Sequence, residues 1–599
     1  LALLCSVGHA QAASVVIPFS ELGYGSDQSL GGPNPKFGIF VPVYPQLKAL
    51  HVHIPLRISP LIDRRSSLTL MVNERPVFTE SLASLGAAPV IDQTIMVPSG
   101  PRTSMEVALQ GKFFRKGDIC FDLDTSDFWL NVLHTGSLTA ITGPVAHKPF
   151  IRDFLQDYRG SIRIVMPQNA NTQSRYSALR LAYYLHQINR WRHTSVTMAA
   201  SRDAAGRNIV FGSFSEPLQV RGNDLYANAD GVTLLNHQLD SLLVTSSVTA
   251  VQYDQHATEA VRERTFEDLG MPTQTQTGID EMPFQVPLAL NEIGGLPSNL
   301  HLHVALTHTA LVPEDRASVK IMVNNTLEHS FGVRPEGGEE DFDVPINDDV
   351  LRSSNDVKIV PSYYSKRSAC KGGYPRMTTS LLGSSTVSWD TLDRGLHSVG
   401  DFYNMASGRV AVLVAGDSLV PYAFAVLDSL GTVNASVKQL DVQAYNGSIP
   451  DGYDYAIVVS PPDQLGSFSV PLKPGGKDFS LIEKSSGKVL YRAQYAQPFG
   501  ILQVGAKEAP STLFATYWKD PGVAAGLSRI EPSEVAAQSD DVFLFNQEQA
   551  TYSSTADTPA AHRGKVDRVR QAMIPIIGVF ALLLLALIMF TAQRARRAS

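Results

Sequence analysis

Hydrophobic and polar residues alternate along much of this chain, and the period of the alternation changes between regions. Residues 49–56 alternate apolar and polar side chains with a period of two, which is typical of a strand with one buried face. Similar runs, separated by Gly, Pro, Asn and Asp, extend over roughly 120 residues. They predict a β-sandwich or jelly roll.

The pattern then changes to that of an α/β region. A short apolar strand at 163–166 precedes a helical stretch at 177–191, and further apolar strands follow at 195–198 and 208–211. This β–α–β order predicts a parallel sheet. A later region repeats the plan, with strands at 410–414 and 455–459 around a helix near 422–430.

The whole two-part unit is duplicated. Four short matches recur in the same order at almost one offset, between 247 and 251 residues, which chance does not explain. The matches are Phe19–Gly23 with Phe266–Gly270, His51–His53 with His301–His303, Met71–Asn73 with Met322–Asn324, and Cys120 with Cys370.

Composition limits the class of protein. The 599 residues predict about four domains. A hydrophobic fraction of 44% supports several packed cores and excludes a disordered or fibrous chain. The net charge of −7 lacks the basic character of a nucleic-acid binder, so we expect no nucleic acid among the partners. Three cysteines do not make a disulfide framework.

The two ends predict the compartment. Residues 1–12 look like the end of a secretory signal peptide, with Ala10-Gln11-Ala12 as the cleavage site, so the mature chain is expected to begin near Ala13. Residues 572–592 are uncharged, almost wholly apolar and long enough to span a bilayer. We therefore expect an exported N-terminal region, a single transmembrane helix and a cytosolic stub at 593–599.

This organisation resembles the family of periplasmic regulatory subunits of bacterial cellulose synthase. The resemblance rests on the order of the parts, the Phe-x-x-Leu-Gly opening of each repeat, and stretches such as Ser66–Asn73 and Asp127–Leu130. It implies two copies of a jelly-roll, carbohydrate-binding-like sandwich followed by a flavodoxin-like α/β domain. The expected parts are a signal remnant (1–12), sandwich 1 (13–147), α/β domain 1 (148–262), sandwich 2 (263–397), α/β domain 2 with an extension (398–560), an interfacial helix (561–571) that lacks the family's Trp residues, the anchor (572–592) and the stub (593–599).

The resemblance also implies a function. The family is a non-catalytic partner of a polytopic catalytic subunit in the inner membrane, and it guides the emerging β-1,4-glucan into the periplasm. Cyclic-di-GMP, which activates synthesis, is expected to act through the catalytic partner. The small residues Gly578, Ala581 and Ala586 of the anchor are expected to allow close packing on that partner's helices, and Pro575 is expected to kink the anchor toward them.

Two alternatives remain at this stage. One is an accessory subunit of a related exopolysaccharide synthase. The other is an exported glycoside hydrolase, which needs two carboxylates about 5–9.5 Å apart across a cleft. The acidic groups Asp122/Asp124 and Glu339–Asp341 are too generic to assign to that role.

Three motifs suggest chemistry that their context opposes. Gln187–Trp191 reads Q-x-x-R-W and Asp122–Asp124 reads D-x-D, as in processive glycosyltransferases, but nucleotide sugars are cytosolic and both motifs lie in the exported part. Arg159 and Arg163, with Asp27, Ser29 and Gly32, match the halves of a cyclic-di-GMP pattern in the wrong order. We therefore predict no catalytic residues.

Metal and cofactor sites are not expected either. The pairs His51/His53 and His301/His303 share a strand face, but neither pair has an evident third ligand, so half-exposed strand histidines are predicted. The turn at Gly416–Leu419 carries a carboxylate where a phosphate needs backbone N–H groups, so no FMN is expected.

Aromatic rings are the remaining candidates, because sugar C–H groups pack on them. Phe128, Trp129 and Trp389 are the candidate glycan contacts, with the strand core as the alternative for each. Whether Cys120 and Cys370 pair depends on how their domains meet, which the sequence leaves open.

Overall fold

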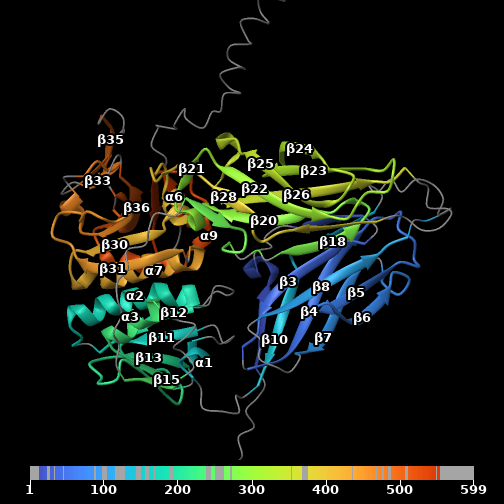
Figure 1. Ribbon diagram of the computed structural model, residues 1–599. Helices are drawn as coiled ribbons and strands as arrows, with labels where there is room; N and C mark the ends of the chain where they lie inside the picture. Colours follow the sequence, from blue (N-terminus) through green and yellow to red (C-terminus); the bar gives the residue numbers. More distant parts are fainter. Residues whose placement is uncertain are drawn as a thin grey trace, which may run out of the picture.

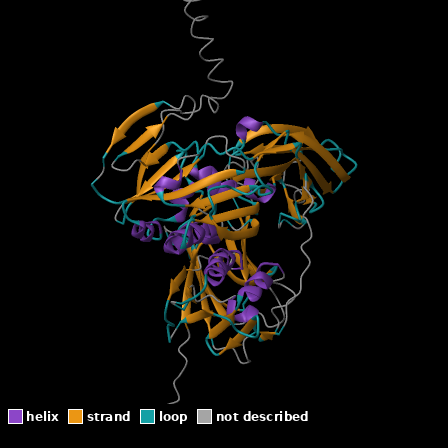
Figure 2. Cartoon of the chain, turned by 90° about the vertical axis from the view of Figure 1, so that its left-hand side faces the viewer, coloured by secondary structure: helices purple, strands orange, loops and turns teal. Residues whose placement is uncertain are grey.

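The computed structural model describes residues 13–553 with gaps, the larger ones at 98–103, 117–127, 144–149, 156–160, 189–194, 238–244, 250–261, 367–375 and 483–487. Strands dominate the described chain and form layered sheets (Figure 1). Viewed from the side, the helices gather in the middle of the molecule with strands above and below them (Figure 2).

The first sandwich has two facing antiparallel sheets. One contains β1 (Ala13–Pro18), β10 (Ser137–Thr142), β4 (Leu47–Ile58), β9 (Trp129–Val132) and β2 (Gln28–Gly31) in that order, with β7 (Val90–Met96) also paired to β4. The other contains β3 (Lys36–Pro42), β8 (Ser104–Lys112), β5 (Ser67–Val72) and β6 (Arg75–Ser81). The inner faces meet in a core that includes Leu50, Val52, Leu68, Leu70 and Leu109.

The second sandwich repeats this plan. Its larger sheet has the order β17 (Glu263–Thr265), β28 (Thr386–Ser388), β22 (His301–His308), β27 (Met377–Leu381) and β18 (Gln274–Gly278), and β25 (Gly338–Pro345) also pairs with β22. Its smaller sheet has β19 (Asp280–Glu281), β26 (Ser354–Tyr364), β23 (Arg316–Val323) and β24 (Thr326–Gly332), with β20 (Phe284–Ala289) paired to β26. A short ribbon of β21 (Leu296–Ser298) and β29 (Thr391–Asp393) adjoins these sheets in the chain. The predicted sandwiches are thus confirmed as architecture.

The repeated Met-Val-Asn motif forms the same turn in both sandwiches. Asn73 and Glu74 have φ of 46° and 64°, and Asn324 and Asn325 have φ of 51° and 66°. Two successive residues with positive φ make a type I′ turn, whose twist suits a two-residue hairpin. The turns join β5 to β6 and β23 to β24.

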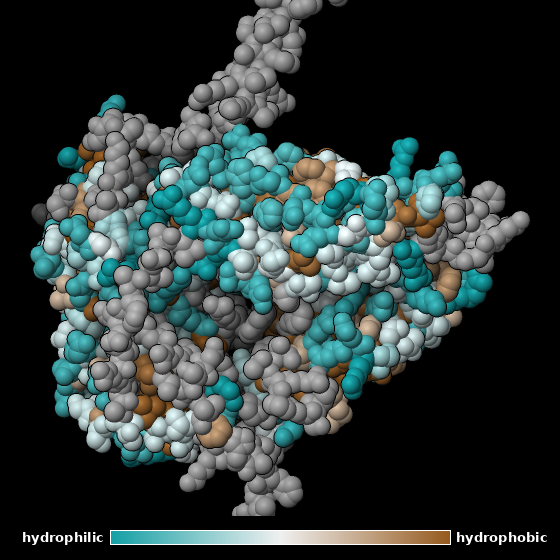
Figure 3. Space-filling view, viewed as in Figure 1, coloured by the Kyte–Doolittle hydropathy of each residue, from teal (hydrophilic) through white to brown (hydrophobic). Residues whose placement is uncertain are grey.

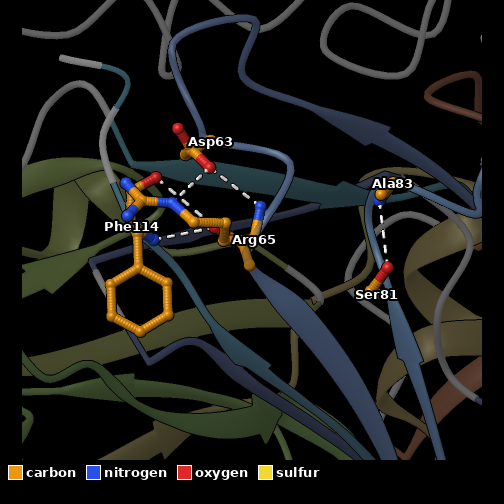
Figure 4. Close-up of polar contacts among 6 residues, drawn as sticks. Asp63, Arg65, Ser81, Ala83 and Phe114 are labelled. Atoms are coloured by element: carbon orange, nitrogen blue, oxygen red, sulfur yellow. Dashed lines mark hydrogen bonds and ion pairs between the residues drawn. The ribbon is translucent and has the colours of Figure 1, made fainter.

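The start of β5 is fixed by side chains of the preceding loop (Figure 4). The carboxylate of Asp63 accepts hydrogen bonds from Nε (2.9 Å) and the backbone N–H (2.8 Å) of Arg65, which lower the pKa of Asp63. Buried Ser66 accepts a 2.8 Å hydrogen bond from the backbone N–H of Phe114. Together these bonds tie the loop before β5 to the chain that follows β8.

The first α/β region contains the predicted parallel strands. Its sheet order is β12 (Ser195–Ala199), β11 (Ser161–Val165), β13 (Arg207–Phe211), β15 (Asp224–Ala227), β14 (Leu218–Arg221) and β16 (Ser247–Val248). The β11–β12, β11–β13 and β13–β15 pairs are parallel. The helices are α1 (Ile151–Leu155), α2 (Thr172–Ile188) and α3 (Ala229–His237). Helix α2 begins five residues before the predicted start, because the Asn171 side chain accepts the Ser174 N–H at 2.8 Å and caps the helix.

The second α/β region has a seven-stranded sheet. The order is β31 (Val437–Ala444), β30 (Gly408–Val414), β32 (Tyr455–Val459), β37 (Ser511–Trp518), β36 (Phe499–Val504), β38 (Val542–Phe545) and β39 (Ala550–Ser553), of which the first four are parallel. A three-stranded sheet of β33 (Leu472–Pro474), β34 (Phe479–Ile482) and β35 (Val489–Ala493) is inserted between β32 and β36. The helices are α6 (Val399–Met405), α7 (Val420–Val433), α8 (Ala524–Leu527) and α9 (Pro532–Ala536), and α5 (Leu290–Ile293) lies in the preceding sandwich.

Within the part of the chain that the structure describes, no helix combines the length and apolar character needed to cross a membrane. The predicted leader (1–12), interfacial helix (561–571), anchor (572–592) and stub (593–599) all lie outside the described residues. They stay predictions, as do the packing roles of Pro575, Gly578, Ala581 and Ala586.

Candidate functional site on the outer faces of the two sandwiches

The alternation along β4 places one set of side chains in the core and another on the outer face of the large sheet. His51 and His53 lie on this outer face and share the carboxylate of Asp92 on β7. His51 Nε2 is 2.8 Å from one Asp92 oxygen, and His53 Nδ1 is 3.2 Å from the other. The Nδ1 atom of His51 is also 3.1 Å from the hydroxyl oxygen of Thr94.

The second sandwich has a related arrangement, in which each histidine has a carboxylate of its own. His301 Nδ1 and His303 Nε2 each lie 3.4 Å from a carboxylate of β25, Asp343 and Asp341 respectively. The histidines are therefore half-exposed strand residues with acidic neighbours, as predicted. Among the described residues, no group of three or more His, Cys, Asp or Glu side chains has a geometry suited to a metal ion.

The three aromatic candidates lie in different places in the structure. Phe128 is 2% exposed in the first sandwich core, and Trp389 is 5% exposed in the core that includes the second sandwich. Both predicted glycan contacts are wrong, because neither ring presents a face to a ligand. Trp129 lies half-buried on β9, with the core residues Leu130 and Val132 pointing the other way. It remains the aromatic candidate on the outer face.

Polar groups surround Trp129 on this outer face. Gly31 on the edge strand β2 is its direct cross-strand partner, and the next row along contains Ser29, Asn131 and Arg57 on neighbouring strands. The Arg57 side chain is 68% exposed. The indole of Trp129 on β9 thus has no side chain directly opposite it on the edge strand β2.

A carboxylate lies at the far end of this face. Asp27 Oδ1 accepts the backbone N–H of His134 at 3.0 Å and lies 2.7 Å from its Nδ1, while Asp27 Oδ2 is 3.9 Å from Arg57. The hydrogen bond from the His134 backbone, then that from its side chain, lowers the pKa of Asp27. The carboxylate is therefore ionised near neutral pH and held in place.

The equivalent face of the second sandwich carries paired hydroxyl groups. The Thr277 and Thr378 hydroxyl oxygens are 2.8 Å apart, as are those of Thr275 and Ser380. Thr307 on β22 follows Ser380 in the same row. Polar residues colour most of the visible surface over β22 to β26 (Figure 3).

The motifs that suggested chemistry are separated in space or have structural partners. Gln187, at the end of α2, donates from Nε2 to the Val437 carbonyl at 2.6 Å, while residues 189–191 of the same motif lie outside the described chain. Asp122, Asp124, Arg159, Cys120 and Cys370 also lie outside it. Arg163 sits on β11 and Asp27 in the first sandwich, so the two halves of the nucleotide-binding pattern belong to different sheets.

Helix α2 of the first α/β region contacts the turn before α7. Arg175 Nη1 lies 3.3 Å from Asp417 Oδ2, and the Thr172 hydroxyl is 3.5 Å from Oδ1. The carboxylate at this helix start thus faces a cation from α2. The expectation that no FMN binds here stays a prediction, and the ion pair is consistent with it.

A buried contact between α2 and α7 was missed by sequence reasoning. The Tyr183 hydroxyl donates to the Asn434 carbonyl at 2.7 Å and accepts the Val437 N–H at 3.0 Å. His186 Nε2 is 2.8 Å from Asp428, and a Cβ on Gly431 would lie 2.8 Å from the His186 ring. Figure 1 shows the two helices side by side. The sequence carried part of the signal, because Leu181–Leu185 are five successive apolar or aromatic residues, which need cover on more than one side of the helix, and all of them are buried.

Comparison with known proteins gives one family match, and it covers one segment of the chain. Residues 259–392 match the family described as the first CBM domain of the cellulose synthase BcsB, and this segment is the second sandwich. No curated protein matches the chain.

Solved structures give weaker likenesses. The CBM36-1 domain of a multidomain xylanase from the hindgut metagenome of Trinervitermes trinervoides is 9% identical, with 22% of this chain and 100% of that domain covered and a TM-score of 0.15. Xylanase 10C from Cellvibrio japonicus is 11% identical over 32% of this chain and 34% of its own, with a TM-score of 0.15. Such low scores carry no argument about this chain. The family match does, and over the second sandwich it supports the predicted resemblance to the cellulose synthase BcsB family.

Proposed function

We propose that this chain is the non-catalytic, membrane-anchored periplasmic subunit of a bacterial cellulose synthase, and that it guides the emerging β-1,4-glucan away from the membrane. The observation that carries the proposal is the match of residues 259–392 to a carbohydrate-binding domain of the cellulose synthase BcsB. The catalytic partner is a polytopic glycosyltransferase of the inner membrane. Cyclic-di-GMP acts through that partner, and this chain binds no cofactor itself.

The α/β regions serve as a scaffold in this proposal. The order β31–β30–β32–β37 with parallel pairing supports a flavodoxin-like fold for the second region. The contact of Asp417 with Arg175 and Thr172 supports a structural role for the turn at which such folds bind a phosphate. We infer that the two regions hold the sandwiches in place rather than carry out chemistry.

The anchor provides the test. Replacing residues 572–592 by poly-Leu of equal length keeps membrane insertion but removes the small residues Gly578, Ala581 and Ala586. Glucan synthesis in membranes that contain the catalytic subunit is expected to fall sharply, and co-purification of the two subunits is expected to be lost. Reporter fusions after Ser599 and near Gly400 check that the swapped chain keeps its orientation. Full synthesis with the swapped anchor contradicts this role of the segment, and synthesis that is unchanged without the chain contradicts the proposed function itself.

A further inference from the structure

We propose that the hairpin of β34 and β35 contacts the outer surface of the inner membrane, with its apolar tip among the headgroups of anionic phospholipids. The inference rests on the membrane anchor of the proposed function and adds a second membrane contact, in a described part of the chain. It is carried by the exposed apolar residues of the hairpin, by its positive charge, and by its position beside the end of the described chain.

The two faces of the hairpin differ in character. Phe479 and Leu481 on β34 are buried in a small core that includes Trp518. Ser480 and Ile482 alternate with them along the strand, so they belong to the outer face. The inner face accounts for the packing of the inserted sheet, and the outer face is left to solvent or to a partner.

The hairpin ends in exposed apolar side chains. Val489 pairs with Ile482 and is 39% exposed, and Leu490 is 38% exposed. A register shift beside this pair leaves Leu490 without a cross-strand partner. Among the described strands, β35 pairs with β34 alone, so its other edge is open. An open edge strand with exposed apolar residues is a liability in water, and contact with a partner removes it.

Cations form the next row behind this tip. Ser480 pairs with Lys473 on β33 and with Arg492 on β35, so the two cations share the outer face. The row of Ile482 lies two residues, or about 7 Å, further along β34. Apolar faces of interfacial segments lie about 5–10 Å inside the boundary between headgroups and acyl chains, so the cations match the level of the lipid phosphates.

The charge of the segment favours an anionic surface. Residues 473–492 contain five Lys or Arg and two Asp or Glu, a net charge of +3, whereas the whole chain has a net charge of −7. Lys and Arg beside anionic lipids strengthen membrane binding, and salt screens this attraction. Because an open strand edge is not tolerated in the hydrocarbon layer, the contact is confined to the level of the headgroups.

The tip lies at the end of the second α/β region where the described chain stops. Ser553, the last residue of β39, pairs with Val542 on β38, which pairs with Gln503 on β36. The Gln503 side chain bonds to both backbone groups of Leu472, and Leu472 pairs with Leu481, next to the tip. Figure 1 shows β35 at the outer corner of this region, beyond β33 and β36. The predicted anchor begins 19 residues further on, so the tether holds this corner within roughly 65 Å of the bilayer.

The test measures fluorescence quenching of the labelled full chain in nanodiscs of phosphatidylglycerol and phosphatidylcholine that include a lipid with a nitroxide on its headgroup. The native cysteines are replaced by serine, and the fluorophore is attached to Ser480→Cys. The control label is attached to Ser195→Cys on β12, an exposed serine on the edge strand of the other α/β region. Strong quenching is expected at Ser480→Cys and none at Ser195→Cys. In phosphatidylcholine alone, or at about 0.5 M salt, the quenching is expected to fall severalfold.

Two variants test the two parts of the contact. Val489→Ser combined with Leu490→Ser removes the apolar tip and is expected to shift the docking equilibrium roughly tenfold toward the undocked state. Arg492→Gln is expected to shift it roughly fivefold. The matched control Val77→Ser changes an apolar residue that is 48% exposed on β6, and it is expected to leave the quenching unchanged. Thermal unfolding checks that the variants stay folded, which is expected because each altered side chain is exposed.

The outcomes separate this inference from the proposed function. Absence of quenching at Ser480→Cys in a chain that stays with the nanodisc overturns the lipid contact, as does quenching that the tip variant leaves unchanged. Shielding of the label that grows with protein concentration and not with the nitroxide lipid assigns the edge to a second copy of the chain and also overturns it. Glucan synthesis with the catalytic subunit is measured in parallel, and its independence of the whole chain overturns the proposed function instead.

Discussion

Tyr183 offers the sharpest test of how the two repeats are held together. Its hydroxyl bridges the end of α7 and the start of β31, donating to the Asn434 carbonyl at 2.7 Å and accepting the Val437 N–H at 3.0 Å. The Tyr183 side chain is fully buried. Tyr183→Phe removes these two hydrogen bonds while it keeps the ring and nearly all of the packing.

The expected magnitude follows from the two lost bonds. Each buried hydrogen bond contributes about 0.5–1.5 kcal/mol net, so the substitution is expected to weaken the contact by about 1–3 kcal/mol. That free energy corresponds to a factor of roughly 5–150 in the equilibrium for opening the contact. The effect is expected on both sides, in α2 of the first α/β region and in β31 of the second.

Hydrogen exchange measured by mass spectrometry reports this opening directly. Peptides that cover α2 and β31 are expected to exchange faster in Tyr183→Phe than in the wild type. Tyr226→Phe is the matched control, since Tyr226 lies on β15, where it contacts Phe214 and the side chains of Arg202 and Arg221. If α2 and β31 exchange at wild-type rates in Tyr183→Phe, the hydroxyl does not hold the two regions together and the reasoning fails.

Two further predictions concern the sandwiches. The fully buried His308 side chain lies 2.9 Å from Glu340, so His308→Ala leaves a buried carboxylate without this partner. The substitution is expected to lower the free energy of unfolding, measured by calorimetry, by about 3–5 kcal/mol. The control His301→Ala on the same strand removes an exposed pair and is expected to cost at most about 1 kcal/mol, so equal effects of the two would contradict the argument. The lowered pKa of Asp27 means that its contact with His134 contributes to stability above pH 3.8 and that this contribution is lost as the pH falls through the lower folded pKa. A carboxyl NMR titration of the wild type is expected to show that lower midpoint, and a midpoint at 3.8 refutes the argument. His134→Ala keeps the backbone N–H, which is the largest cause of the shift, so its midpoint is expected to return only part of the way toward 3.8.

The alternation of apolar and polar residues is enough to decide which of the neighbouring aromatic residues faces outward. Phe128 directly precedes Trp129, the first residue of β9, so extended chain there lets at most one of them face outward. Leu130 and Val132 share the face of Phe128, and their apolar character already assigns that face to the core. Alternation therefore excludes Phe128 as a glycan contact, and Trp389 is excluded because it lies just after β28 with its ring in the core.

Some of the remaining features have a local signal in the sequence, and others do not. The hairpin turns at Asn73 and Asn324 follow from residue type, and the parallel sheets follow from the β–α–β order. The partner of α2 does not, because buried residues on all sides of a helix indicate cover without naming what provides it. Packing between elements about 250 residues apart is decided by three-dimensional shape, as the contact of Gly431 with His186 illustrates.

The hydrophobic cores show how the α2–α7 contact is related to the sandwich face that carries Trp129. One continuous core joins the first α/β region, the second sandwich and the second α/β region, whereas the first sandwich has a separate core of its own. A buried hydrogen bond of 3.2 Å from Gln46 to the Asp153 carbonyl links this sandwich to α1. The face that carries Trp129 therefore belongs to a separately packed module, and the module adjoins a scaffold that α2 and α7 fix to the second repeat.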